Sequence, residues 1–343
     1  MLTKALLNDE DAILVVYTGG TFGMHDEGRG LEAKDDLKTD LVELIAATHQ
    51  PGPATQWKYV ALDHVIDSAD ATLDHALAIA ALIRSNRANT KGVVVLHGTD
   101  TLAYAAAVAA FALDDLQLPI VFTGSQRPLG EAGSDAPRNF TDAYRDADDG
   151  APGVRIAFGG RVLPAVRAIK FSSNADEAFI AYRPIVPGAI GMVAHTQRFD
   201  QLSRDSAKPS NLRIAATGLL RVFPGMDPAL IRAATDIYAG GLVLECYGAG
   251  TGPTSTPGLS AAIAAATDSG TPIIAITQCH TGAVELERYA AGAALHLAGA
   301  WGGHDLTTEA ALAKLGVLNA LGLAWHELRD AFASNLVGEQ LTV

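Results

Sequence analysis

Two apolar runs, each followed at once by a short peptide rich in glycine and threonine, constrain this chain more than any other feature. The runs are Ile13–Tyr17 and Val93–Leu96, and the peptides are Thr18–Thr21 and His97–Asp100. A strand buried on both faces has a continuous apolar sequence, so both runs predict interior strands of a parallel sheet. The carboxyl ends of such strands share one edge of the sheet, where ligands bind. We therefore expect the two peptides to face the same crevice.

Strand-like and helix-like segments go on alternating beyond these runs. The strand pattern continues in Ile120–Phe122 and Val154–Phe158, and the Ala-rich segments Leu73–Ile83 and Leu102–Leu113 are typical of helices. This alternation predicts βαβ units and a parallel sheet with helices on its faces.

A polar segment, 202–212, interrupts the alternation, which resumes with Leu242–Leu244 and Ile273–Ile276. From Thr307 to Leu341 the pattern predicts helices. A chain of 343 residues is long enough for two domains. We therefore predict an α/β protein in three parts: a larger N-terminal three-layer parallel-sheet domain over 1–201, a linker over 202–212 and a smaller C-terminal α/β domain over 213–343.

Composition limits the classes of partner. The net charge is −13, whereas nucleic-acid and anionic-membrane binders need clustered Lys and Arg. No apolar run approaches the ~20 residues of a membrane span, and Met1–Asp11 lacks the features of a signal peptide. Cys246 and Cys279 have neither disulfide-framework nor metal-ligand spacing. We expect a cytoplasmic protein that uses no metal or cofactor and binds neither nucleic acid nor membrane.

Thr21 is a candidate nucleophile. It follows a strand and the pair Gly19-Gly20, and glycines allow positive φ and close approach of the backbone. Successive amide groups in such a turn bind an oxyanion, which would place Thr21 beside its own oxyanion donors. The alternative is an ordinary strand-to-helix turn with Thr21 as a cap, and the spacing does not choose between the two.

Thr99 and Asp100 open a second turn, where capping a helix is the commonest role of either residue type. A carboxylate at the mouth of a cleft also holds an ammonium group, and free helix N–H groups hold a carboxylate, which together suit an amino-acid zwitterion. Lys170 lies in a mostly apolar stretch, Arg167–Phe171. Partial burial there would favour its neutral form and make it a base, whereas a solvated lysine would only cover apolar surface with its stem.

Short motifs spread over nearly the whole chain resemble those of bacterial-type L-asparaginases, most closely the cytoplasmic type I branch. The Thr-Gly-Gly-Thr and His-Gly-Thr-Asp-Thr blocks together make this resemblance highly specific. The motifs are, in order, Thr18–Thr21, Asp67-Ser68, His97–Thr101, Thr123–Pro128, Lys170, Tyr247-Gly248, Thr277–Cys279 and Gly302-Gly303.

The resemblance implies hydrolysis of L-asparagine to L-aspartate and ammonia, without a cofactor, by a homodimer or homotetramer with active sites at subunit contacts. It implies Thr21 as the nucleophile and a second polar triad of Thr99, Asp100 and Lys170 as catalytic residues. The reverse assignment, with Thr99 as the nucleophile or as the activator of a direct attack by water, stays open.

The same resemblance implies a substrate-binding set. Ser68 and Asp100 would hold the amino-acid end of the substrate, and Ser125 would lie on a loop near the leaving amide. The expected set is Gly20, Ser68, Gly98, Thr99, Asp100 and Ser125.

Several positions depart from the family pattern. The family has a tyrosine, usually after a glycine, in the mobile lid that follows the first threonine, whereas this chain has Gly30-Leu31. Ile169 and Glu245 stand where type I members often have threonine and arginine that contribute to an allosteric asparagine site. Ala69 replaces a polar residue. We expect a different activation of Thr21, no cooperative activation and a looser pocket that also admits glutamine or D-asparagine.

Two further functions are compatible with parts of this pattern. Leu31 motivates a catalytically weakened relative that binds an amino acid as a sensor, although the presence of Thr21, Thr99 and Lys170 opposes it. The second of these functions is that of the asparaginase-like subunit of a tRNA-dependent amidotransferase. The acidic charge and the 12 residues before the first apolar run disfavour that subunit.

Overall fold

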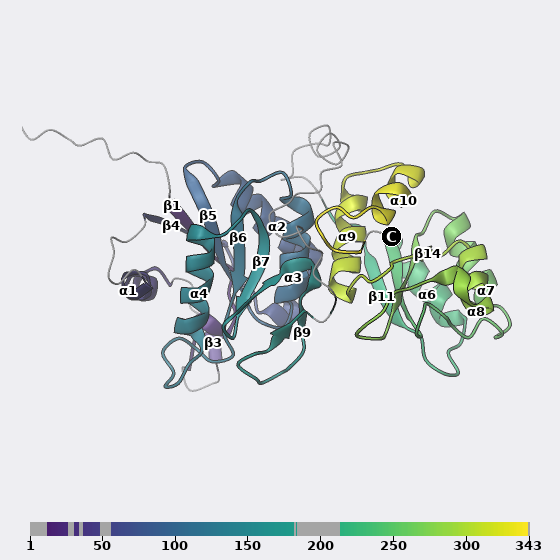
Figure 1. Cartoon of the computed structure of the whole chain (residues 1–343), viewed down its shortest axis with the longest axis horizontal. Helices are drawn as coiled ribbons and strands as arrows, with labels where there is room; N and C mark the ends of the chain where they lie inside the picture. Colours follow the sequence, from purple (N-terminus) through teal and green to yellow (C-terminus); the bar gives the residue numbers. More distant parts are fainter. Residues whose placement is uncertain are drawn as a thin grey trace, which may run out of the picture.

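The computed structural model describes residues 12–26, 31–33, 37–48, 56–181, 183 and 213–341. Within them the chain forms two main parallel sheets flanked by helices, one toward each end of the sequence (Figure 1). The predicted linker and the boundary at residue 201 lie outside the described residues, so the exact division into domains stays a prediction.

The N-terminal sheet contains all four apolar runs that were expected to be strands near the start of the chain. Its first five strands run parallel and its last, β8, is antiparallel to β7. In spatial order the strands are β4 (Trp57–Ala61), β1 (Ala12–Tyr17), β5 (Thr90–Leu96), β6 (Pro119–Thr123), β7 (Gly153–Phe158) and β8 (Arg161–Pro164).

The chain order of this sheet reverses between β1 and β5. After β1, the next strand of this sheet along the chain is β4, which pairs with one edge of β1. The chain then crosses to the other edge of β1, where β5 pairs, followed by β6 and β7. Open α/β sheets bind ligands at such a switch point, outside the carboxyl ends of the strands. The peptides that follow β1 and β5 therefore lie where a ligand site is expected.

Helices cover both faces of the N-terminal sheet, which confirms the three predicted layers. Leu14 and Val16 of β1 join the apolar cluster formed with α2 (Leu73–Ser85) and α3 (Leu102–Ala112). Ile13 and Val15 point the other way, into the cluster formed with α1 (Lys38–Thr48) and α4 (Ala136–Asp149). Successive side chains of a strand face opposite sides, so a strand covered on both sides must be apolar throughout.

The C-terminal sheet has four parallel strands. Its strands are β11 (Thr217–Arg221), β12 (Gly241–Cys246), β13 (Ile273–Thr277) and β14 (Trp301–Gly302). The helices around it are α6 (Ala229–Ile237), α7 (Leu259–Asp268), α8 (Ala290–Leu297), α9 (Thr308–Ala320) and α10 (Trp325–Ala333). Helices α6 and α7 cover one face, and α9, backed by α10, covers the other. No helix within the described ranges is both long and apolar enough to cross a bilayer.

The two sheets share one apolar core. Helix α9 packs on α3 of the N-terminal part, and Figure 1 shows α9 between the two sheets, with α10, in yellow, beside it. A single cluster of buried side chains therefore runs from Val93 and Val95 through these helices to Val243 and Ile274 of the C-terminal sheet.

The end of the chain departs from the helical prediction. The segment from Ser334 to Leu341 is not helical. Its amides bond to side chains instead, because the Glu339 carboxylate accepts the N–H groups of Leu336 and Val337. Helical periodicity in the sequence thus extended past the true end of α10 at Ala333.

Candidate active site

The loops that follow β1 and β5 touch each other through glycine. Thr18 donates from its amide and its hydroxyl to the carbonyl oxygen of Leu96, at 3.0 and 2.9 Å. Gly20 has a φ of +88°, and a methyl group on it would collide with the backbone of Gly98. Only glycine meets both conditions, so these positions are set by the close approach of the two loops.

Ser68 joins the same contact from the segment after β4. It starts the short 3-10 helix η2 (Ser68–Asp70), and its hydroxyl oxygen accepts the Asp100 N–H at 3.3 Å. Its carbonyl oxygen accepts the Thr101 hydroxyl at 2.8 Å, and a methyl group on Gly98 would lie 2.5 Å from the Ser68 hydroxyl. Segments after β1, β4 and β5 thus form one compact polar centre.

Thr99 and Asp100 do not cap the following helix. Helix α3 begins at Leu102, and its N-cap residue is Thr101. Both earlier side chains are bonded to Lys170 instead: its ammonium group donates to Thr99 Oγ1 at 2.8 Å and to Asp100 Oδ1 at 2.7 Å. The Lys170 side chain is 18% exposed and that of Asp100 59%, so the ion pair opens to solvent on the carboxylate side.

Lys170 reaches this centre from a short two-stranded ladder. Strand β9 (Ile169–Lys170) pairs with β10 (Phe179–Ile180), and Lys170 is opposite Phe179. An ammonium group donates hydrogen bonds and accepts none. The Thr99 oxygen is therefore the acceptor, and its own hydrogen is directed elsewhere.

Thr21 opens the 3-10 helix η1 (Thr21–Gly23), for which Gly20 is the N-cap residue. Thr21 is half-buried, whereas the next residue, Phe22, is in the core. The carbonyl oxygen of Phe22 accepts the Leu129 N–H at 3.1 Å, which ties the turn to the loop after β6. Thr21 is thus not a cap, and its turn is fixed on both sides.

Comparison with models of known protein families tests the family resemblance that the sequence motifs indicated. The family model described as "Asparaginase, N-terminal" matches residues 12–200, and the one described as "Glutaminase/Asparaginase C-terminal domain" matches residues 217–332. The chain belongs to the asparaginase family. The resemblance inferred from the sequence motifs is confirmed.

Comparison with individual proteins shows which members of the asparaginase family this chain is similar to, and over how much of its length. It is 32% identical to L-asparaginase 1 of Escherichia coli K12 over 336 residues, which cover 96% of this chain and 97% of that protein. It is 34% identical to the mouse 60 kDa lysophospholipase over 361 residues, and there the match spans 97% of this chain but 63% of the relative. The solved structure of the thermostable L-asparaginase from Thermococcus kodakarensis superimposes with a TM-score of 0.82 at 28% identity, and the match covers 97% of this chain and all of that one.

Of the expected site residues, the structure brings together Gly20, Ser68, Gly98, Thr99, Asp100 and Lys170, with Thr21 next to Gly20 in the chain. Ser125 is different, because its buried hydroxyl donates to the Arg127 carbonyl oxygen of its own loop at 2.6 Å. A role of Ser125 near the leaving amide stays a prediction.

Asp135 is a structural residue of the site that the sequence interpretation missed. Its carboxylate accepts the N–H groups of Gln126 and Arg127 and the side-chain amide of Asn139, at 2.9–3.1 Å. Asn139 also donates to the Gly124 carbonyl oxygen at 3.0 Å. An aspartate just before a helix, with a polar residue four positions later, is the sequence signal for such a brace.

His97 is the buried first residue of the loop that follows β5. Burial lowers its pKa, so the ring is neutral near pH 7, and its Nδ1 is 2.8 Å from the Gly98 carbonyl oxygen. Its ring packs on Phe122, with centroids 6.4 Å apart. His97 thus supports the loop by packing and by one local hydrogen bond. Among the described residues, no group of His, Cys, Asp and Glu side chains could hold a metal ion.

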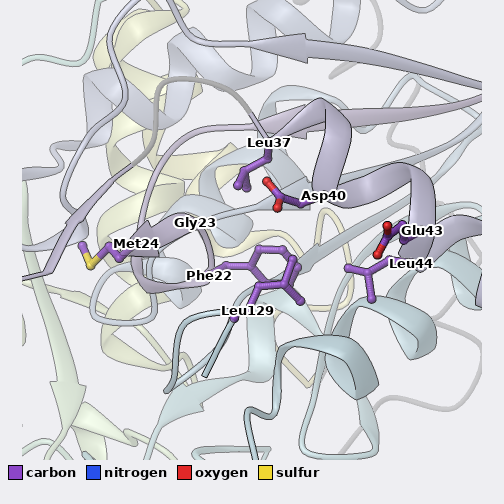
Figure 2. Close-up of a pocket in the computed structure, with 9 residues that line it drawn as sticks. Phe22, Gly23, Met24, Leu37, Asp40, Glu43, Leu44 and Leu129 are labelled. Atoms are coloured by element: carbon purple, nitrogen blue, oxygen red, sulfur yellow. The ribbon is translucent and has the colours of Figure 1, made fainter. Parts of the chain in front are cut away.

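A groove of about 370 Å³ lies behind the Thr21 turn. Figure 2 shows Phe22 and Leu129 on one side of it, with Asp40 and Glu43 of α1 opposite. Its floor also includes Gly23, where a methyl group would collide with the Tyr17 hydroxyl. The groove is thus lined by the Thr21 turn, by α1 and by the loop after β6, while Phe22 of the turn also packs in one buried cluster with Leu41 and Ile45 of α1.

The positions that depart from the family are only partly covered by the structure. Leu31 begins strand β3 (Leu31–Ala33), opposite Asp26 of β2 (Met24–Asp26), while Gly30 lies outside the described residues. The carboxylate of Glu245 accepts a hydrogen bond from the hydroxyl of Thr308 in α9 at 2.6 Å. Ala69 is exposed beside Ser68.

Proposed function

We propose that this protein hydrolyses L-asparagine to L-aspartate and ammonia, with Thr21 as the nucleophile. The observation that carries the proposal is the Lys170 ammonium group, which is bonded at once to Thr99 and to Asp100 at the switch point of the sheet. A carboxylate that is 59% exposed at such a place suits the ammonium group of an amino acid. The E. coli and Thermococcus relatives are named L-asparaginases.

The reaction divides into two acyl-transfer steps. Thr21 Oγ attacks the side-chain amide carbon of the substrate, the proton that the hydroxyl loses passes to the amide nitrogen, and the C–N bond breaks to release ammonia. Water then attacks the resulting ester near Thr99 and releases L-aspartate, which restores the Thr21 hydroxyl. A carboxamide is a poor electrophile with a poor leaving group, and a covalent intermediate replaces one difficult step by two easier ones.

Lys170 contributes electrostatically to the second step. Its ammonium group donates to Thr99 Oγ1 and stabilises the negative charge that develops beside it as water attacks the ester and its proton passes to the departing Thr21 oxygen. Ser68 and Asp100 would hold the amino-acid end of the substrate, and Gly20 and Gly98 allow the two loops that carry the site to approach each other closely.

Single-turnover mass spectrometry with L-asparagine tests the assignment of the nucleophile. Thr21→Ala is expected to form no acyl-enzyme, because the attacking oxygen is missing. Thr99→Ala is expected to accumulate it, because hydrolysis of the ester is slowed. Accumulation in Thr21→Ala but not in Thr99→Ala would assign the nucleophile to Thr99.

Ammonia release from L-asparagine, D-asparagine and L-glutamine tests the substrate. We expect L-asparagine to be the best of the three, with measurable side activity because Ala69 leaves the serine side of the pocket open. A lysophospholipid belongs in the panel, since the mouse relative is named a lysophospholipase. Fatty-acid release without ammonia release would contradict the proposal, and so would asparagine binding without turnover.

The proposal includes self-association into a dimer or tetramer. The edge strand β11 and the residues after it carry exposed apolar side chains at Leu219 and Phe223. Exposed apolar side chains on a sheet edge favour association. Sedimentation velocity at micromolar concentration should show a species larger than one chain, and a monomer would refute this part.

A further inference from the structure

A buried ion pair ties the strand that carries Lys170 to the C-terminal part of the molecule. Arg167 ends the 3-10 helix η3 (Ala165–Arg167), three residues before Lys170. Its Nη1 donates to Asp305 Oδ2 at 3.0 Å and to the Asp305 carbonyl oxygen at 3.2 Å. The two side chains are 1% and 3% exposed, so the pair is closed off from solvent.

Asp305 is itself held by the end of the chain. Its second carboxylate oxygen accepts the Leu341 N–H at 2.9 Å. The segment that leads to Leu341 is fixed by another buried ion pair, in which Lys314 Nζ lies 2.6 Å from Glu339 Oε1 and neither side chain is exposed. The position of Asp305 is therefore set by α9 and by the C-terminal segment together.

The contact at Arg167 fixes the backbone of β9 from its start. Ala168 is buried between Arg167 and the strand. Beyond the strand, Phe171 continues the pairing, because its N–H donates to the Ala178 carbonyl oxygen at 2.8 Å. The Lys170 stem has a limited reach, and its ammonium group meets both Thr99 and Asp100 at 2.7–2.8 Å, so this double contact depends on where the β9 backbone lies.

We propose that Arg167 and Asp305 are positioning residues that hold β9 so that Lys170 reaches both Thr99 and Asp100. A buried ion pair is weak evidence of a stabilising role, because desolvation offsets its Coulomb energy. Here the two hydrogen bonds from Arg167 to Asp305 join the start of β9 to the C-terminal part of the molecule. The proposal rests on the proposed function, since the effect of a misplaced Lys170 is read partly through turnover. A displacement of about 1 Å at a catalytic group costs up to ~100-fold in rate.

A double-mutant cycle tests the coupling. Asp305→Asn keeps the shape of the side chain and removes its charge, and we expect it to lower kcat/KM for L-asparagine about 30-fold. In a Lys170→Met background the same change should lower the residual rate less than about 2-fold, because the group that it misplaces is already absent. Equal losses in both backgrounds would show a general structural effect and would overturn the proposal.

Asp146→Asn is the matched control. Asp146 also pairs with a buried arginine, Arg155, at 2.6 Å, but this pair joins α4 to β7. It should lower the melting temperature to a similar degree and change kcat/KM less than about 3-fold. If Asp146→Asn lowers turnover as much as Asp305→Asn, the effect is not specific to Lys170.

Chemical modification of Lys170 gives a measurement that needs no activity. The rate at which an amine-reactive acetylating reagent modifies Lys170, followed by mass spectrometry, should rise about 5-fold in Asp305→Asn and stay unchanged in Asp146→Asn, because only the first frees the ammonium group. If the natural chain releases no ammonia, the proposed function fails, and this rate alone decides the positioning role. An unchanged rate in Asp305→Asn would overturn it.

A milder pair of variants covers the case in which Asp305→Asn does not fold. Leu341→Pro removes the Leu341 N–H that Asp305 accepts, whereas Leu341→Ala keeps it. We expect Leu341→Pro to raise the Lys170 modification rate about 2-fold and Leu341→Ala to leave it unchanged. Equal rates in the two variants would count against the proposal.

Discussion

At the scale of single residues, the candidate site depends on two glycines that belong to different loops. Gly20 and Gly98 lie so close that a side chain on either would enter the other's loop or the Ser68 hydroxyl. The reason is steric rather than chemical, because neither glycine brings a functional group. The Thr21 and Thr99 turns are thereby held at a fixed separation.

Gly20→Ala is expected to destabilise the fold by about 3 kcal/mol and to reduce turnover about 100-fold. The alanine would bring both a strained positive φ and a collision with the Gly98 backbone. Gly133→Ala is the control, since Gly133 has a φ of +75° but nothing within 4 Å of an added methyl group. It should cost about 1 kcal/mol and leave turnover unchanged. Chemical denaturation and ammonia release measure both, and equal losses in the two variants would refute the steric explanation.

The sequence predicted those residues of the site that lie in the loops after apolar strands. Thr21, Thr99 and Asp100 follow recognisable runs, so their shared edge of the sheet could be inferred from strand patterning. The pair of Arg167 and Asp305 could not be inferred, because 138 residues separate them. Pairing at that range depends on how α9 docks on α3, which no local pattern records.

At the scale of elements, the first turn of α9 contains a carboxyl group that titrates far from its usual range. Burial, with a smaller contribution from the nearby Glu245 charge, raises the pKa of Glu309 to about 7. The folded protein therefore binds a proton there between the ordinary value of 4.5 and about 7, while the unfolded chain does not. Stability from this group is fully present below pH 4.5 and is lost as the pH rises through 7.

Glu309→Gln is expected to remove this pH dependence, because glutamine stays neutral. Between pH 5 and pH 8 the natural chain should lose ~2 kcal/mol of unfolding free energy relative to the variant. Denaturant titrations at both pH values measure the difference. Glu131→Gln, on an exposed loop, serves as control and should leave the slope unchanged. A Glu309→Gln variant that keeps the full slope would refute this explanation.

Regular elements followed their sequence patterns closely, whereas the segment after α10 did not. Helix α2 extends the predicted Leu73–Ile83 by two residues, and α3 matches its prediction to within one residue. The segment after Ala333 was wrongly predicted to be helical, because side chains rather than main-chain carbonyls accept its amide N–H groups. The periodicity of apolar residues shows which face of a segment is apolar. It does not show whether side-chain acceptors will compete with main-chain carbonyls for the backbone N–H groups.

At the scale of the whole molecule, the two sheets are joined by an apolar core rather than merely connected by the chain. Helices α3 and α9 pack on each other and contribute to one cluster that reaches both sheets. Separating the two parts would expose that cluster to water, which opposes independent unfolding.

The chain is therefore expected to unfold in one cooperative transition. Trp57 lies in β4 of the N-terminal sheet, and Trp301 and Trp325 lie together in the C-terminal part, with ring centroids 5.0 Å apart. Variants that retain only Trp57 or only Trp301, with the others replaced by Phe, should each report the same fluorescence midpoint as circular dichroism, within about 2 °C. Midpoints that separate within one variant would show two independently unfolding units.

Attempts to change the substrate preference of this site by mutation are limited at its centre, because Gly20 and Gly98 tolerate no side chain. A library that randomises Gly20 or Gly98 should return chiefly misfolded clones, whatever substrate is selected for, because the loops interlock there. Diversity belongs at exposed positions beside this centre, such as Ala69 next to Ser68. New substrate preferences are thus expected to arise from the periphery of the pocket, around an invariant pair of turns.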